Sequence, residues 1–179
     1  MAERDSDLFA ISEVDDIENM YLTFEVEDEE YAVNIAYVTE IVGMQKISEV
    51  PDVPEFVKGV VNLRGKVIPL MDIRLRFGLA WRGYSDRTTI IVLEMGDVPT
   101  GLVVDRVTDV LSLSPESITP PRWQRGDGDP VVKGLGRRDD GVSIILDVPR
   151  LLSARDVRLD LSPEALAVAD SATVPEKAA

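Results

Sequence analysis

The sequence contains neither cysteine nor histidine. The lack of cysteine excludes disulfides and thiolate metal sites. The lack of histidine excludes imidazole ligands, a base with an ordinary pKa near neutral pH, and Ser-His or Cys-His nucleophiles. Carboxylate pairs, Ser-Lys pairs and oxygen-ligated Mg²⁺ or Ca²⁺ stay open, so catalysis is disfavoured without being excluded. We expect a protein that is not an enzyme and that holds no cofactor and no metal.

Long apolar runs are missing as well. No stretch approaches the roughly 20 unbroken apolar residues that a membrane-spanning helix needs. The first residues, Met1 to Asp5, are acidic and lack the basic-then-apolar order of a secretion signal. We therefore expect a cytoplasmic protein that does not insert into a membrane.

Positive charge is scarce at one end of the chain. Residues 1–30 hold 12 acidic side chains and one basic one, whereas the rest of the chain holds 21 acidic and 18 basic side chains. The folded part is therefore nearly balanced, and residues 1–17 are predicted to be a flexible acidic tail. Nucleic-acid binding needs a basic stripe, preferably with stacking aromatic side chains. Only 6% of the residues are aromatic, so we expect no nucleic-acid partner.

The apolar residues that are present mostly follow a strand pattern. Tyr21 to Val26 and Tyr31 to Ile35 flank an acidic turn, which predicts a hairpin. Val38 to Val42 alternates apolar and polar residues, as a half-buried strand does. Val57 to Leu70 forms two β runs joined around the segment Asn62 to Gly65. These runs predict an all-β fold.

Three short helices interrupt the strands. Asp72 is a candidate N-cap before Ile73 to Phe77, and Asp147 occupies the same place before another short apolar run. Ser162-Pro163-Glu164 has the order of an N-cap, a proline at the first helical position and a favourable acid. We therefore expect a short helix and a tail within residues 156–179.

The second half of the chain repeats the first. Its β runs match those of the first half at two constant offsets, of 69 and then 75 residues. The matched pairs are Tyr21–Val26 with Ile90–Met95, Val38–Val42 with Val107–Leu111, Val57–Val60 with Val132–Leu135, and Asp72 with Asp147. We interpret residues 20–80 and 88–153 as two repeats. They predict two small five-stranded β-barrels of the SH3 or OB type, with an exchange of strands between them left open.

The repeat fails at one hairpin tip. When the two repeats are aligned, Asn62-Leu63-Arg64-Gly65 corresponds to Arg137-Arg138-Asp139-Asp140, although the Lys-Gly pair before each tip recurs. Residues shared by both copies are expected to serve the fold. Asn62, Leu63 and Arg64 are not shared, and we therefore expect them to determine binding specificity.

Three segments together form a known pattern. The longest is the unbroken block from Pro54 to Arg74, and the others are Glu30 to Val33 and Val103 to Val107. This pattern closely resembles the signature of the CheW family. The resemblance extends from about Met20 to Leu152, so residues 18–155 are predicted to form a CheW-like domain. Too few residues follow for a kinase or response-regulator segment, which suggests a free-standing coupling protein.

The resemblance implies a non-catalytic chemotaxis adaptor in cytoplasmic receptor arrays. Such a scaffold couples the tips of methyl-accepting chemoreceptors to a CheA-type histidine kinase. The kinase carries a related domain that docks barrel to barrel, and the helical receptor tip lies in a hydrophobic groove between the two lobes. In isolation the protein is expected to be a monomer.

The resemblance also gives candidate interaction residues. Arg64 lies in the characteristic hairpin, where its guanidinium suits bidentate pairing with a carboxylate of a partner. Glu40 is implied to lie on the same surface, where it could pair with Arg64. Ile35 and Val38 are implied to give an apolar face to the contact with the kinase; from the residues alone, it is equally open that they point into the core.

Two other functions remain as alternatives. One is a histidine-free hydrolase with Asp72 and Asp147 as its carboxylates. The repeat places these two residues at equivalent points of separate lobes, which suits helix caps better than one active site. The other alternative is an oligonucleotide-binding β-barrel.

Overall fold

The computed structural model describes residues 17–96, 98–122 and 131–152. Nearly all of the expected acidic tail, most of the connection between Pro120 and Pro130, and the expected C-terminal helix lie outside these ranges. Within them, the chain is all-β with a few short helices, as the sequence predicts. No helix in the described ranges has the length and apolar character to cross a bilayer.

The two halves of the chain form corresponding series of elements. The first half contains β1 (Met20–Val26), β2 (Glu29–Asn34), the 3-10 helix η1 (Ile35–Tyr37), β3 (Val38–Gly43), β4 (Val57–Leu63), β5 (Lys66–Asp72) and α2 (Ile73–Arg76). The second half contains β6 (Thr89–Met95), β7 (Val98–Val104), β8 (Arg106–Ser112), η2 (Pro115–Ser117), β9 (Ile118–Thr119), β10 (Val132–Arg138), β11 (Gly141–Leu146) and α3 (Val148–Leu152).

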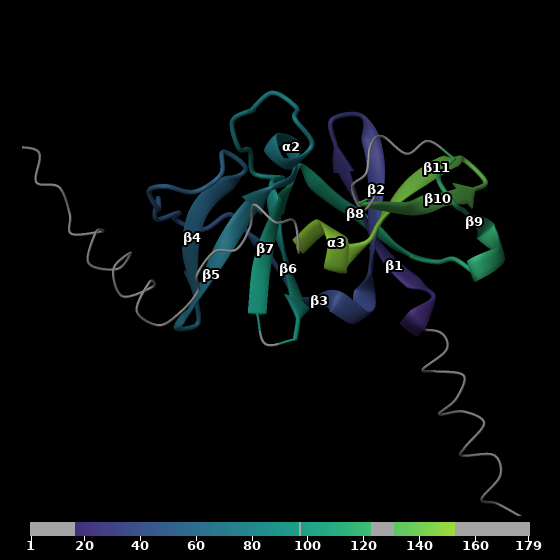
Figure 1. The fold of residues 1–179 in the computed structure, drawn as a ribbon, viewed down its shortest axis with the longest axis horizontal. Helices are drawn as coiled ribbons and strands as arrows, with labels where there is room; N and C mark the ends of the chain where they lie inside the picture. The colour runs from purple at the N-terminus through teal and green to yellow at the C-terminus, as the bar shows by residue number, and fades with distance from the viewer. Residues whose placement is uncertain (1–16, 97, 123–130, 153–179) are drawn as a thin grey trace, which may run out of the picture.

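Each of the two sheets combines strands from both halves. One sheet has the order β8-β1-β2-β11-β10-β9, and the other has the order β3-β6-β7-β5-β4. The first hairpin, β1–β2, therefore pairs with strands of the second half, and the hairpin β6–β7 pairs with strands of the first half. The sheets lie side by side as two lobes, with α3 between them (Figure 1).

The strand registers of the two lobes correspond residue by residue. Ile41 of β3 pairs with Ile91 of β6, and the residues 69 positions away, Val110 and Leu22, pair in the other lobe. The parallel pairs β5–β7 and β11–β2 also correspond. The five strands expected for each lobe are found in one sheet, whereas the other has six, because β9 makes a two-residue ladder with β10. At the corresponding place, the described part of the five-stranded sheet has only an isolated bridge between Ser48 and Val60.

The largest hydrophobic core lies between the two sheets. It combines buried side chains from both sheets with one from α2 and two from α3. Its buried members are Leu22, Phe24, Val26, Val33, Met71, Ile73, Ile91, Leu93, Leu102, Val104, Leu146, Val148 and Leu151. Each lobe adds a smaller cluster of its own, around Leu70 and Ile90 in one and around Tyr21 and Ile145 in the other. Because most of the buried apolar surface is shared, each lobe depends on the other for its stability.

The glycine of each recurrent Lys-Gly pair follows a β-bulge at the lysine. A Cβ at Gly59 would lie 2.2 Å from the Ser48 carbonyl oxygen, and a Cβ at Gly134 would lie 2.8 Å from that of Thr119. Only glycine allows the neighbouring backbone to approach so closely. These two glycines therefore serve the fold, as their recurrence predicts.

Gly59→Ala is expected to destabilise the protein by about 2 to 4 kcal/mol, since it combines overpacking with strain. The strain arises because Gly59 has a φ of +136°, which residues with a Cβ rarely adopt. Urea unfolding measures the change. Gly43→Ala is the matched control, because nothing lies within 4 Å of its added Cβ. Equal stability of the two variants would contradict the packing argument.

Candidate functional site

The β4–β5 hairpin turns tightly at Arg64 and Gly65. Their φ angles are +52° and +83°, and the flanking residues Leu63 and Lys66 pair with each other. This is a two-residue turn of type I′, which usually takes Asn-Gly. The Asn62 side chain accepts a hydrogen bond from the Gly65 N–H at 2.9 Å and so fixes the turn. An arginine at the first turn position is a costly choice for the fold, and such strain often marks a functional position.

Arg64 forms an ion pair with Glu40, as the sequence analysis considered. Its Nη2 lies 2.9 Å from Glu40 Oε1, and the two side chains are 84% and 27% exposed. The pair brings the hairpin tip to β3, the strand at the opposite edge of the same sheet. An ion pair this exposed contributes at most about 1 kcal/mol to stability. Arg64 makes no other hydrogen bond within the described residues, so most of its donors remain available to a partner.

The equivalent ion pair is missing from the second lobe. At the matched offsets, Glu40 corresponds to Asp109 and Arg64 to Asp139. Two carboxylates cannot pair, yet the strands around them keep the same register. The barrel therefore forms without the Glu40–Arg64 pair, which leaves binding as the better explanation for it.

Asn62 and Leu63 differ from Arg64 in their surroundings. Asn62 is exposed, but its side-chain oxygen is used in the turn. Leu63 is half-buried and packs against the cluster around Leu70. Both residues position Arg64, whose side chain is highly exposed and touches Glu40.

Ile35 and Val38 lie where the core reaches the surface. Both are half-buried and pack against the core between the sheets, Ile35 from η1 and Val38 from the start of β3. Three positions further along β3, Ile41 is 46% exposed. Of the three residues, Ile41 places exposed apolar surface on an edge strand. Sequence reasoning missed Ile41, although the alternation in β3 could have indicated it.

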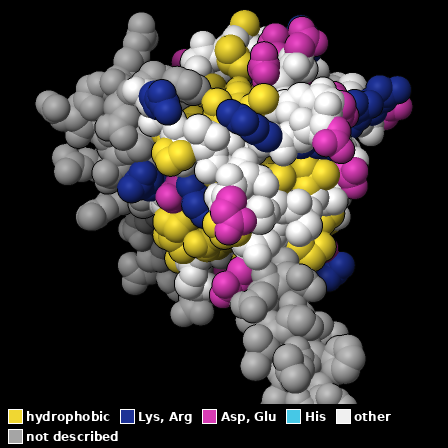
Figure 2. All heavy atoms as spheres, turned by 90° about the vertical axis from the view of Figure 1, so that its right-hand side faces the viewer, with side chains coloured by type: hydrophobic (Ala, Val, Ile, Leu, Met, Phe, Trp, Pro, Cys, Tyr) yellow, Lys and Arg dark blue, Asp and Glu magenta, His cyan; other side chains and the backbone are white. Residues whose placement is uncertain are grey.

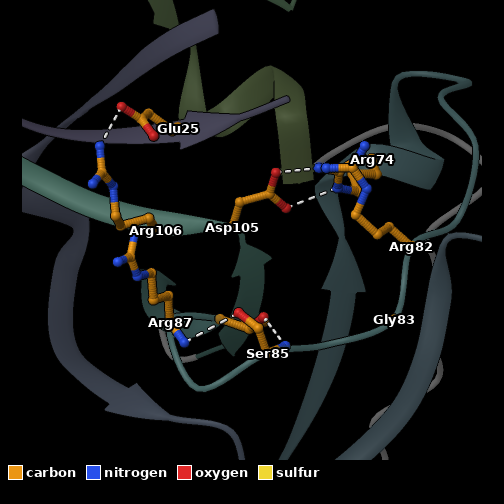
Figure 3. Close-up of a pocket in the computed structure, with 9 residues that line it drawn as sticks. Glu25, Arg74, Arg82, Gly83, Ser85, Arg87, Asp105 and Arg106 are labelled. Carbon is orange, nitrogen blue, oxygen red and sulfur yellow. Dashed lines mark hydrogen bonds and ion pairs between the residues drawn. The ribbon is translucent and has the colours of Figure 1, made fainter. Parts of the chain in front are cut away.

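A buried arginine links the two lobes. Arg74 of α2 is 4% exposed and binds Asp105 through two nitrogens, Nε lying 2.7 Å from Oδ1. It also pairs with Glu27, from the turn between β1 and β2 (Figure 3 shows the Asp105 contact). The hydrogen bond with Asp105 raises the pKa of Arg74 further above its ordinary value. The roles of Arg74 and Asp105 could not be predicted from the sequence, because their contact spans 31 residues of sequence.

Asp72 and Asp147 are helix caps. Asp72 is buried; its Oδ1 accepts a hydrogen bond from the Arg74 N–H at 2.9 Å, and its Oδ2 accepts one from the Tyr84 hydroxyl at 2.9 Å. Burial and the Asp72 charge raise the pKa of Tyr84. Asp147 Oδ1 accepts a hydrogen bond from the Arg150 N–H at 3.0 Å. Each carboxylate is thus held within its own cap, and this arrangement does not support the hydrolase alternative.

Comparison with known proteins gives the family. A family model described as a CheW-like domain matches residues 20–156. The chain belongs to the CheW family. The chemotaxis protein CheW of Klebsiella aerogenes is 37% identical over 140 residues, which are 78% of this chain and 84% of that protein. CheW of Helicobacter pylori is 34% identical over 152 residues, which are 84% of this chain and 92% of that protein.

A solved CheW structure shares the fold. The scaffolding protein TtCheW from Thermoanaerobacter tengcongensis matches with a TM-score of 0.70 and 34% identity, over 78% of this chain and 95% of that one. The two-lobed all-β architecture described above is therefore a CheW architecture. In this CheW-like domain, the Arg64 hairpin lies in one lobe, and the Arg74 ion pairs join the two lobes.

The charge on the face that carries β9, β10 and β11 does not favour the oligonucleotide-binding alternative. Figure 2 views the end of the molecule that carries β9, β10 and β11. On the described part of this face, basic and acidic side chains alternate with hydrophobic ones, and they form no basic stripe. A nucleic-acid backbone needs a continuous positive surface.

Arg74→Met is expected to destabilise the protein by about 3 to 5 kcal/mol, because removing one partner leaves Asp105 and Glu27 without their buried counter-charge. Arg106→Met is the control. Arg106 pairs with Glu25, but both side chains are well exposed, so a change below about 1 kcal/mol is expected. Urea unfolding of both variants checks the difference. A loss of similar size in the two would show that the buried ion pairs do not hold the lobes together.

Proposed function

We propose that this chain is a non-catalytic cytoplasmic adaptor that couples chemoreceptor tips to a CheA-type histidine kinase. Its membership of the CheW family supports this function, and so does the chemotaxis role named for its relatives. The observation that carries the proposal is the exposed Glu40–Arg64 pair, which only one of two otherwise equivalent lobes possesses. The fold does not need the pair, and its geometry suits a partner.

Arg64 and Glu40 are assigned to the kinase contact. A guanidinium held by one carboxylate at its Nη2 still offers donors to a second carboxylate. Glu40 orients Arg64 across the sheet, and the type I′ turn projects it away from the barrel. Asn62 and Leu63 hold that turn in place.

Ile35, Val38 and Ile41 are assigned to the receptor tip. The resemblance implied a kinase contact for Ile35 and Val38. Their packing against the core between the lobes instead suits the receptor, whose helical tip is expected in the groove between the lobes. An amphipathic helix binds through apolar side chains spaced along one face, and partly exposed aliphatic residues on the protein are complementary to it.

An adaptor with two binding surfaces can activate a kinase without chemistry of its own. Docking receptor and kinase on one small domain raises their effective concentration and fixes their relative orientation. The Arg74 ion pairs and the shared core make the two lobes a rigid unit, so the two surfaces keep a fixed separation.

Arg64→Asn is expected to weaken binding to the kinase's CheW-related domain at least tenfold, as loss of a charge-assisted contact costs roughly 2 kcal/mol or more. Asparagine accepts the left-handed backbone at this turn, so the free energy of unfolding should change by less than about 1 kcal/mol. Isothermal titration calorimetry measures the affinity.

The matched control for this experiment is Arg137→Asn, which changes an exposed arginine of the equivalent hairpin in the other lobe. Its kinase affinity should equal that of the wild type. If Arg64→Asn also binds normally, the site assignment is wrong. If the wild type binds neither the kinase nor a receptor fragment, the adaptor function itself is wrong.

Ile41→Thr is expected to reduce binding to a receptor cytoplasmic fragment several-fold while leaving kinase binding intact. The change removes exposed apolar surface from β3 but keeps a β-branched side chain that suits a strand. Val142→Thr, at an exposed position of β11, is the control. A pull-down with receptor fragments measures the binding of each variant. Equal binding of Ile41→Thr and Val142→Thr would contradict the assignment.

A further inference from the structure

A pocket of about 540 Å³ lies where the two lobes meet. It is lined by residues of four segments: Glu25 of β1, Arg74 of α2, Asp105 and Arg106 where β7 passes into β8, and the connection between α2 and β6. That connection contributes Arg82, Gly83, Ser85, Arg87 and Thr88. None of the residues assigned above to partner docking lines this pocket, so it is a separate feature of the molecule (Figure 3).

The pocket is positively charged in a protein whose net charge is −14. Four guanidinium groups and two carboxylates line it. The two carboxylates are already engaged: Asp105 binds Arg74, and Glu25 Oε1 lies 2.6 Å from Arg106 Nη2. Arg82 and Arg87 form no ion pair within the described residues. Because Arg74 also pairs with Glu27, the four guanidinium groups face three carboxylates, which leaves an excess of one positive charge and two arginines, Arg82 and Arg87, available to a ligand.

The connection that carries these two arginines is held in a defined shape. The Ser85 N–H donates to Thr88 Oγ1 at 2.8 Å, and the Thr88 N–H donates to the Ser85 carbonyl at 3.2 Å. The Ser85 hydroxyl oxygen accepts from the Arg87 N–H at 3.2 Å and keeps its own proton free to donate. The hydrogen bond from Tyr84 to Asp72 ties the connection to the cap of α2. Arg87 and Ser85 are thus presented together at the pocket.

We propose that this pocket binds a compact, diffusible anion that carries a phosphate group. Guanidinium forks match the oxygens of phosphate, and a doubly charged group neutralises both Arg82 and Arg87. The volume is within the range of small-molecule sites. Among the described residues, the lining contains no aromatic or large apolar side chain, so the site recognises the phosphate rather than an attached base or a peptide chain.

Phosphate binding at this place would tie the lobes together. Glu25 and Arg106 belong to strands of the six-stranded sheet, whereas Arg74, Arg82 and Arg87 come from the other lobe. A ligand that contacts both sides binds the folded, assembled state and raises its melting temperature. The site thus gives the domain a means of sensing a small anion, independent of the adaptor function proposed above.

The test titrates the full chain separately with inorganic phosphate, pyrophosphate and ADP at low ionic strength, with chloride as the monovalent control. Isothermal titration calorimetry and the thermal unfolding midpoint are read out. Saturable binding with a Kd of roughly millimolar for phosphate is expected, accompanied by a rise in Tm. Equal affinity for pyrophosphate and ADP supports recognition of the phosphate chain itself, whereas tighter binding of ADP would overturn it, because the adenosine would then be recognised as well.

The decisive variant is Arg82→Gln combined with Arg87→Gln. Neither side chain makes an internal ion pair, so folding is preserved, and phosphate affinity is expected to fall at least tenfold. Arg137→Gln, an exposed arginine on β10 outside the pocket, should bind as the wild type does. The proposal is overturned if none of the three anions binds saturably, or if the double variant binds phosphate as tightly as the wild type.

Discussion

The hydrophobic core between the two sheets is the interaction on which the rest of this structure depends. Each half of the chain contributes a hairpin to the sheet formed mainly by the other half, and α3 lies between the two sheets. Neither sheet could bury its inner face alone, since the hydrophobic cluster that lies within each single lobe is small. The hydrophobic core holds the two sheets together, and the Arg74 ion pairs add contacts of defined direction between them. Together they fix the positions of the binding surfaces relative to each other.

The near-equivalence of the two lobes separates what the fold requires from what binding requires. Gly59 and Gly134 occupy the same bulge and meet the same kind of backbone contact, so they belong to the fold. Arg64 corresponds to an aspartate and Arg74 to a proline, and neither is needed to form a barrel. The lobes differ where the molecule presents charge, at the hairpin tip and at the seam between them.

Local sequence patterns predict much of this structure. The hairpins, the caps at Asp72 and Asp147 and the two offsets are visible in the sequence because each depends on residues close together in the chain. The Glu40–Arg64 contact could also be anticipated, because the resemblance placed both residues on one surface. The sixth strand, β9, was not anticipated. Two residues between a 3-10 helix and a proline give too little pattern to distinguish a strand from a turn.

The sequence by itself determined the all-β class, the repeated order of elements and the family. Each of these follows from periodicity, turn chemistry or a dense motif. Only the tertiary structure decided which strands share a sheet, and which arginines are buried, paired or free. Those outcomes depend on contacts between distant segments, such as Arg74 with Glu27 and Asp105. Local propensity is silent about such contacts, because they form only when the lobes assemble.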